Sequence, residues 1–159
     1  MMDTAATISQ AVAAAGYTLP RVVQKDTPFL LYRQAGDHLY VSGMIAQFEG
    51  DRPYLGRLGA ELATSEGVKA AELSALNILA WLAKACDDRL DRVDCCLALN
   101  GFVACTPAFT EQSQVISGAS RLIVTVLGES GRHTRTSIGV TALPFGVPVE
   151  INATFVLLD

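Results

Sequence analysis

The chain has 159 residues, of which 50% are hydrophobic and 18% are charged, so it is long enough for one domain with a buried core. Its formal net charge of -4 and its pI of about 5.1 argue against a surface built to bind the phosphates of nucleic acids. No segment approaches the ~20 apolar residues of a membrane span, and the N-terminus lacks the regions of a signal peptide, which predicts a cytoplasmic protein.

The first predicted element is a helix over residues 4–15, where apolar side chains recur at helical spacing before Gly16. We assign residues 1–28 to an N-terminal helical extension and residues 29–159 to the domain that follows. The helix is expected to pack against the edge of that domain or against a neighbouring subunit, and it carries no recognisable chemistry.

Alternating side chains then predict a hairpin, with strands over residues 31–34 and 39–44 around the turn signal Gly36-Asp37. Residues 46–60, which contain three glycines and a proline, are typical of a solvated loop. These glycines do not form a phosphate-binding loop, because no Gly-Lys-Ser/Thr sequence follows them.

A broad apolar stripe predicts a long helix from Thr64 or Ser65 to Cys86, and its excess width indicates that more than one surface covers it. The next apolar run, over residues 93–103, predicts a strand. No zinc site is expected from the four cysteines, because they form no C-x-x-C pair; buried reduced thiols are the expected state and a catalytic cysteine is the alternative.

A second helix is expected to begin at Thr106-Pro107, as cap and first-turn proline, and to stop at Gly128. Gly118 lies inside this helix, where glycine costs up to ~1 kcal/mol relative to alanine. Close approach of another backbone or of a ligand would explain its presence.

The last quarter of the chain is predicted to form another hairpin, broken by Pro-Phe-Gly-Val-Pro. Ile138 and Val140 alternate with Arg135 and Ser137, so the apolar face is expected to lie on a helical layer. On the polar face, Arg135 and Glu150 would then stand on adjacent strands. They could surround a small ligand, form a cross-strand ion pair, or remain two exposed charges.

Taken in order, these elements predict an α+β fold: a mixed sheet with two helices on one face. The other face of the sheet is left without a cover from this chain. It must therefore meet either water or copies of itself.

The C-terminal motif resembles the signature of the YjgF/RidA family of reactive-intermediate (imine and enamine) deaminases, also called endoribonuclease L-PSP. The matching residues are Arg-Thr-Ser-Ile-Gly-Val from Arg135, Leu143-Pro144, and Val-Pro-Val-Glu-Ile-Asn-Ala from Val147. Tyr40-Val41-Ser42-Gly43 and Leu76-Asn77-Ile78-Leu79 resemble upstream parts of the family. The resemblance covers roughly residues 29 to 158.

The resemblance implies a chorismate-mutase-like fold assembled as a homotrimer, with clefts for a small carboxylate-bearing ligand between the subunits. Arg135 would bind the substrate carboxylate, and Glu150 would act on the attacking water and the leaving ammonia. Phe29 stands where the family usually has an aromatic hydroxyl, Gly118 where it often has asparagine, and Ser137 where it often has cysteine. These three positions would line the pocket.

Three functions follow from the sequence. The first is metal- and cofactor-independent hydrolysis of small 2-imino or enamino acids, and the second is binding of a small carboxylate metabolite without turnover. The third, ribonuclease activity, is implied only by the family's older name, and the acidic composition and the absence of basic residues interleaved with aromatic ones argue against it.

Overall fold

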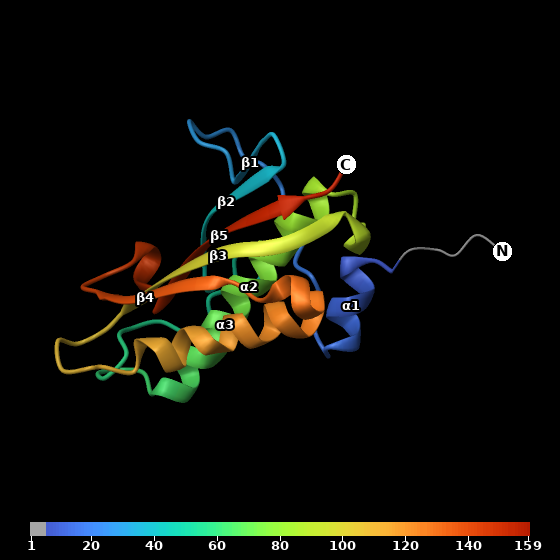
Figure 1. Cartoon of the computed structure of the whole chain (residues 1–159). Helices are drawn as coiled ribbons and strands as arrows, with labels where there is room; N and C mark the ends of the chain where they lie inside the picture. The colour runs from blue at the N-terminus through green and yellow to red at the C-terminus, as the bar shows by residue number, and fades with distance from the viewer. Residues whose placement is uncertain (1–5) are drawn as a thin grey trace.

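The computed structural model describes residues 6–159, which form two layers: a five-stranded mixed sheet and a layer of helices on one of its faces (Figure 1). The strands are β1 (Tyr32–Ala35), β2 (His38–Ile45), β3 (Val93–Ala104), β4 (Thr134–Val140) and β5 (Val149–Leu157). The helices are α1 (Ile8–Ala14), α2 (Thr64–Ala85) and α3 (Gln112–Leu127), with short 3-10 turns η1 (Leu90–Arg92), η2 (Gly128–Gly131) and η3 (Pro144–Gly146). The predicted α+β class and order of elements are confirmed.

The strand order is β1-β2-β5-β3-β4, and β3 and β4 are the one parallel pair among the described strands. The predicted C-terminal hairpin is therefore wrong, because β3 lies between β4 and β5. The connection is long enough for this crossing. It contains the 3-10 turn η3, in which Phe145 takes a left-handed conformation with φ of 60°, and Pro148, whose carbonyl accepts a hydrogen bond from Ala104 N at 2.9 Å.

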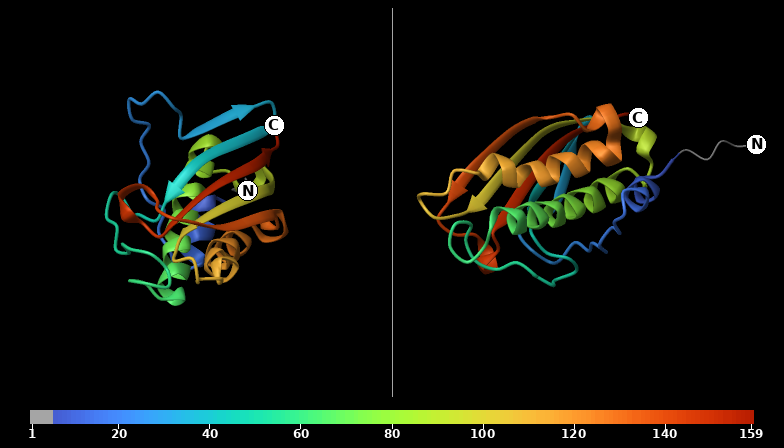
Figure 2. Two further views of the ribbon diagram at one scale, coloured as in Figure 1. Left: turned by 90° about the vertical axis from the view of Figure 1, so that its left-hand side faces the viewer. Right: turned by 90° about the horizontal axis from the view of Figure 1, so that it is seen from below.

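Helices α2 and α3 cover the same face of the sheet (Figure 2). The buried side chains of α2 extend around most of its circumference because the sheet, α3 and α1 all contact it. Gly118 of α3 lies against the backbone carbonyl of Val68, where a Cβ atom would overlap it. The close approach that explains this glycine is therefore that of α2.

Helix α3 begins six residues later than Thr106. The Thr106-Pro107 pair instead forms a turn, in which Phe109 N donates to Thr106 O at 3.1 Å. Thr106 N also donates to Leu58 O at 3.0 Å, which ties the turn to the preceding loop. The prediction that the helix begins at Thr106-Pro107 is therefore wrong, because this pair forms a turn ahead of the helix.

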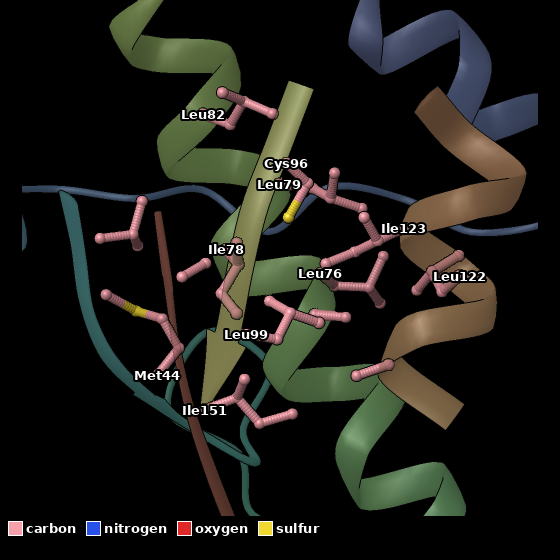
Figure 3. Packing of buried hydrophobic residues seen from close by; sticks show 14 of the residues in the cluster. Met44, Leu76, Ile78, Leu79, Leu82, Cys96, Leu99, Leu122, Ile123 and Ile151 are labelled. Atoms are coloured by element: carbon pink, nitrogen blue, oxygen red, sulfur yellow. The ribbon is translucent and has the colours of Figure 1, made fainter. Parts of the chain in front are cut away.

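The hydrophobic core lies between the sheet and the two long helices (Figure 3). Leu76, Leu79 and Leu82 of α2 meet Leu99 of β3 and Ile123 of α3 there. All five are at most 3% exposed. This single core fixes how the site-bearing strands stand relative to α3.

Helix α1 packs against α2 and α3 of its own chain, with Ile8 and Val12 fully buried. Thr7 and Gln10 form a capping box at its start, and Asp88 accepts bonds from Ile8 N (3.1 Å) and Ser9 N (2.9 Å). Positions 4 and 5 of the predicted helix lie outside the described residues. None of the helices in residues 6–159 is long and apolar enough to cross a bilayer.

Candidate functional site

Arg135 faces the helical layer, contrary to the orientation predicted for β4. In the parallel ladder Arg135 stands beside Leu99 and Ser137 beside Gly101, both of which point toward the helices. Ile138 lies on the bare face of the sheet and is 45% exposed. The prediction failed because α3 presents a polar edge to β4, so that polar rather than apolar side chains of this strand meet the helix.

The guanidinium of Arg135 is held by a ladder of three α3 serines, Ser113, Ser117 and Ser120, spaced four and three residues apart. Its NH1 donates to the hydroxyls of Ser117 and Ser120, both at 3.1 Å. Its NH2 donates to the hydroxyl of Ser113 at 2.7 Å and to the Ser113 carbonyl at 3.3 Å. An otherwise exposed arginine is thus fixed in one orientation at the β4 edge.

His133 extends this network through Ser120. Its Nδ1 lies 2.6 Å from Gly131 O and its Nε2 lies 2.9 Å from Ser120 Oγ. Because a carbonyl can only accept, Nδ1 carries the proton and Nε2 of the neutral ring accepts the Ser120 hydroxyl. Ser120 Oγ is then left with its lone pairs for Arg135, so His133 orients the hydroxyl that orients the arginine.

Glu150 projects from β5 on the opposite face of the sheet. In the register it stands between Phe102 of β3 and Ile45 of β2, two apolar neighbours. Its carboxylate lies over the backbone of Gly43, where a Cβ atom would overlap Oε1. Burial raises the pKa of the Glu150 carboxyl above its ordinary value, and within residues 6–159 no hydrogen bond or ion pair satisfies it.

Arg135 and Glu150 are therefore not neighbours within one chain. They lie on opposite faces and on strands separated by β3, so neither a shared pocket nor the alternative cross-strand ion pair forms between them. The prediction that the two residues share one face on adjacent strands is wrong for two reasons. Strands β4 and β5 do not form a hairpin, and the side chains of β4 face the opposite sides of the sheet from those predicted.

The remaining predicted site residues are also dispersed. Ser137 stands near Arg135 on β4, and its hydroxyl oxygen is buried without a hydrogen-bond partner among the described residues. Phe29, 56% exposed, precedes β1 at the far edge of the sheet from β4. Gly118 is buried in the α2–α3 contact and lines neither of the hollows described next.

Two hollows flank these residues. One, of about 340 Å³, lies on the bare sheet face and is lined by Gly43 beside Glu150, together with side chains of β1, β2 and β5. The other, of about 440 Å³, lies at the ends of β3 and β4 between Cys105, Gln112 and Thr141. Neither reaches Arg135 in the single chain.

The cysteines are all free, and Cys86 and Cys96 are buried. Burial raises the pKa of the Cys96 thiol to about 12 and also raises that of Cys86, which keeps both protonated at neutral pH. Among residues 6–159 no group of three or more His, Cys, Asp or Glu side chains is placed to hold a metal ion.

Sequence reasoning missed the serine ladder and the role of Gly43. The spacing of Ser113, Ser117 and Ser120 places them on one face of a helix, and this polar stripe was the available signal. The function of Gly43 could not be read from the chain alone, because it depends on pairing β2 with β5.

The fold and site define a class of two-layer α+β proteins with one bare sheet face and a polar site divided between that face and the helix-covered edge. The chain belongs to the family described as "YjgF/chorismate_mutase-like, putative endoribonuclease", whose profile matches residues 9–151. The resemblance drawn from the C-terminal motif is thereby confirmed, as is the chorismate-mutase-like fold.

Relatives match over nearly the whole chain. Protein TCP17 of Trypanosoma cruzi is 42% identical over 139 residues, covering 87% of this chain and 86% of that protein. The crystal structure of Atu1372 from Agrobacterium tumefaciens, a protein of unknown function, superimposes with a TM-score of 0.89 at 38% identity, over 96% of this chain and 94% of the other. A crystal structure from Shewanella oneidensis, described as that of a "putative endoribonuclease", gives a TM-score of 0.89 at 30% identity, over 95% of this chain and 99% of the other.

Proposed function

We propose that the protein hydrolyses small 2-imino or enamino acids to the 2-oxo acid and ammonia, with Glu150 as the catalytic acid–base residue. Water adds to the imine carbon, a proton passes to the nitrogen, and the carbon–nitrogen bond breaks as ammonia leaves. No electron transfer occurs, and a protonated imine is already an electrophile, so this chemistry requires neither a metal nor a cofactor.

The observation that carries this proposal is the environment of Glu150. Its side chain is half-buried between Phe102 and Ile45 and has no hydrogen-bond or ion-pair partner within residues 6–159. The carboxylate lies over the backbone of Gly43, which bears no side chain. A carboxylate with a raised pKa is a better base than an ordinary one and can return the proton to a leaving group. A carboxylate with a purely structural role would instead be paired with a cation or a hydrogen-bond donor.

Arg135 supplies the recognition of the substrate carboxylate in this proposal. Its serine contacts are bonds to neutral acceptors, whereas a substrate carboxylate offers a charge-assisted bond, which is roughly twice as strong. We expect the carboxylate to replace part of the serine ladder. The ladder then keeps the guanidinium oriented in the empty site, so that little side-chain entropy is lost on binding.

The two halves of this site require more than one copy of the chain. Arg135 and Ser137 stand at the β4 edge, whereas Phe29 stands at the β1 edge and Glu150 on the bare face. A cyclic assembly brings different surfaces of neighbouring subunits together at each interface. We propose a homotrimer in which each cleft takes Arg135 from one subunit and Glu150 from the next.

The proposed activity is tested by hydrolysis of 2-imino acids generated in situ by an amino-acid oxidase, over small, branched and aromatic side chains. We expect 2-oxo acid and ammonia to form faster than in the spontaneous reaction with the wild type, and at the spontaneous rate with Glu150→Gln. If the wild type gives no acceleration for any imine, the protein is not this deaminase.

A second candidate is binding of a small carboxylate metabolite without turnover. Phe29 carries no hydroxyl to donate to a reacting group, and the residue is largely exposed in the single chain. This alternative predicts that carboxylates bind with dependence on Arg135 while imines hydrolyse only spontaneously. Ribonuclease activity, named in the family description, has less support because the net charge is -4.

A further inference from the structure

The hollow on the bare sheet face is rich in hydrogen-bond donors and carries one charge. Nine residues line it. Arg33 is the one lining residue that is charged at neutral pH, and none of the nine is acidic. Arg33 forms no ion pair or side-chain hydrogen bond with the rest of residues 6–159. Glu150 lies close to the hollow through Gly43, but within residues 6–159 no ion pair joins its carboxylate to Arg33.

The polar neighbours of Arg33 also present donors. Asn152 accepts a bond from Asn100 Nδ2 at 2.8 Å through its Oδ1, so its own amide NH₂ remains free to donate. The Ser42 hydroxyl already donates its hydrogen to Leu30 O at 2.6 Å, so it is not available as a donor to a ligand. Tyr40 and Thr154, which pair across β2 and β5, also line the hollow.

A cation with a free amide donor in the same lining, and with no acidic side chain there, is suited to an oxyanion. The position of the hollow indicates which oxyanion would bind there. Gly43 belongs both to its wall and to the contact with the Glu150 carboxylate, so the hollow begins where the proposed reaction takes place. A group bound there would extend from the reacting carbon, as a substrate side chain does.

We propose that this hollow is a second carboxylate subsite, in which Arg33 binds the side-chain carboxylate of a 2-imino dicarboxylic acid. The inference rests on the proposed function for the identity of the reacting group, but the recognition of a second carboxylate is a property of the hollow itself. Its volume of about 340 Å³ accommodates the side chain of a four- or five-carbon diacid. The preferred substrates are then the imines of acidic amino acids.

The binding test uses calorimetric titration of the full chain with matched pairs: succinate against butyrate, and glutarate against pentanoate. We expect each diacid to bind the wild type at least about tenfold more tightly than its monoacid, because a charge-assisted contact is added. Arg33→Gln should abolish this preference. Arg121→Gln, which removes an equally exposed charge from the outside of α3, should retain it.

Equal binding of diacid and monoacid by the wild type, a preference that survives Arg33→Gln, or no binding of any of the four would overturn the subsite. The hydrolysis assay separates this failure from that of the proposed function. Accelerated hydrolysis without a preference for acidic side chains removes only the subsite. An Arg33-dependent diacid preference without accelerated hydrolysis removes only the enzymatic activity and leaves a dicarboxylate-binding protein.

Discussion

At the scale of single residues, the two charged residues of the proposed site have contrasting hydrogen-bond environments. The guanidinium of Arg135 donates its hydrogen bonds to hydroxyls and a carbonyl of α3, so it is oriented without being neutralised. Glu150 has none, and its carboxylate is held against apolar neighbours. Orientation suits a residue that binds, and desolvation suits one that exchanges protons.

Replacing Arg135 with alanine should reduce kcat/KM for imine hydrolysis by roughly a hundredfold, equivalent to about 3 kcal/mol, because a charge-assisted clamp on the substrate carboxylate is lost. Arg135→Lys should recover little of this loss, since lysine keeps the charge but cannot reach the three serines in a planar fork. Thermal unfolding of both variants should match the wild type. A large drop in stability with unchanged kinetics would show that Arg135 is structural.

Replacing Glu150 with glutamine should stabilise the fold at neutral pH. The pKa of Glu150 is raised, so the folded protein binds its proton more tightly than the unfolded chain does. Its contribution to stability is therefore fully present below the ordinary carboxyl pKa and is lost as pH rises through the raised value. Melting curves should show a higher Tm for Glu150→Gln at pH 7 and no difference in mild acid. A lower Tm at pH 7 would show that the ionised carboxylate has a stabilising partner.

At the scale of elements, sequence periodicity was reliable where one face meets one surface. The stripe of α2 and the alternation of β5 both predicted their buried sides correctly, because each packs against the hydrophobic core. Strand β4 broke the rule. It is an edge strand that turns Arg135 and Ser137 toward polar side chains of α3 and Ile138 toward the bare face. Periodicity shows that a strand has an apolar side, but it does not show whether that side faces the helices or the uncovered face of the sheet.

The same limit applied to topology and to the site. A break of Pro-Phe-Gly-Val-Pro is as compatible with a crossing over β3 as with a hairpin, and the crossing is set by which strands pair. The family motif singled out Arg135 and Glu150 as candidate site residues despite this, since a motif needs no topology. Ser113, Ser120, His133 and Gly43 were missed as site residues because their roles depend on contacts between elements distant in sequence.

Gly118→Ala tests the close contact between α2 and α3. Alanine favours a helix by up to ~1 kcal/mol over glycine, but here its methyl group would overlap the Val68 carbonyl, which belongs to a packed backbone and cannot move aside freely. We expect a net loss of about 1–3 kcal/mol in the free energy of unfolding. Gln114→Ala, at an exposed position of the same helix, is the matched control and should change it little. A more stable Gly118→Ala protein would contradict the packing role.

At the scale of the whole molecule, the bare face of the sheet is the main feature left unexplained by one chain. It carries Ile138, Phe102 and Ile45 in one row across four strands, with Glu150 among them. Apolar side chains gathered on an uncovered sheet face favour burial against another protein surface. In the proposed two-chain site, copies of the chain are this partner.

Ile138→Asp should therefore weaken the assembly by placing a charge in this face. We expect sedimentation analysis to show a trimer for the wild type and smaller species for the variant at micromolar concentration. Val124→Asp, at a residue of α3 that is 37% exposed, is the matched control and should remain trimeric. A monomeric wild type, or a trimer unaffected by Ile138→Asp, would exclude this face as the interface.

The measurement that tests the account most directly is complementation between two impaired variants, Arg135→Ala and Glu150→Gln, unfolded together and reassembled at equal amounts. If each cleft combines Arg135 of one subunit with Glu150 of the next, every mixed trimer contains one intact cleft, and imine hydrolysis should return to about a quarter of the wild-type rate. Treated alone, Glu150→Gln should stay at the spontaneous rate and Arg135→Ala at roughly a hundredth of the wild-type rate. No recovery in the mixture, with mixed trimers demonstrated and the wild type active, would contradict a site built from two chains.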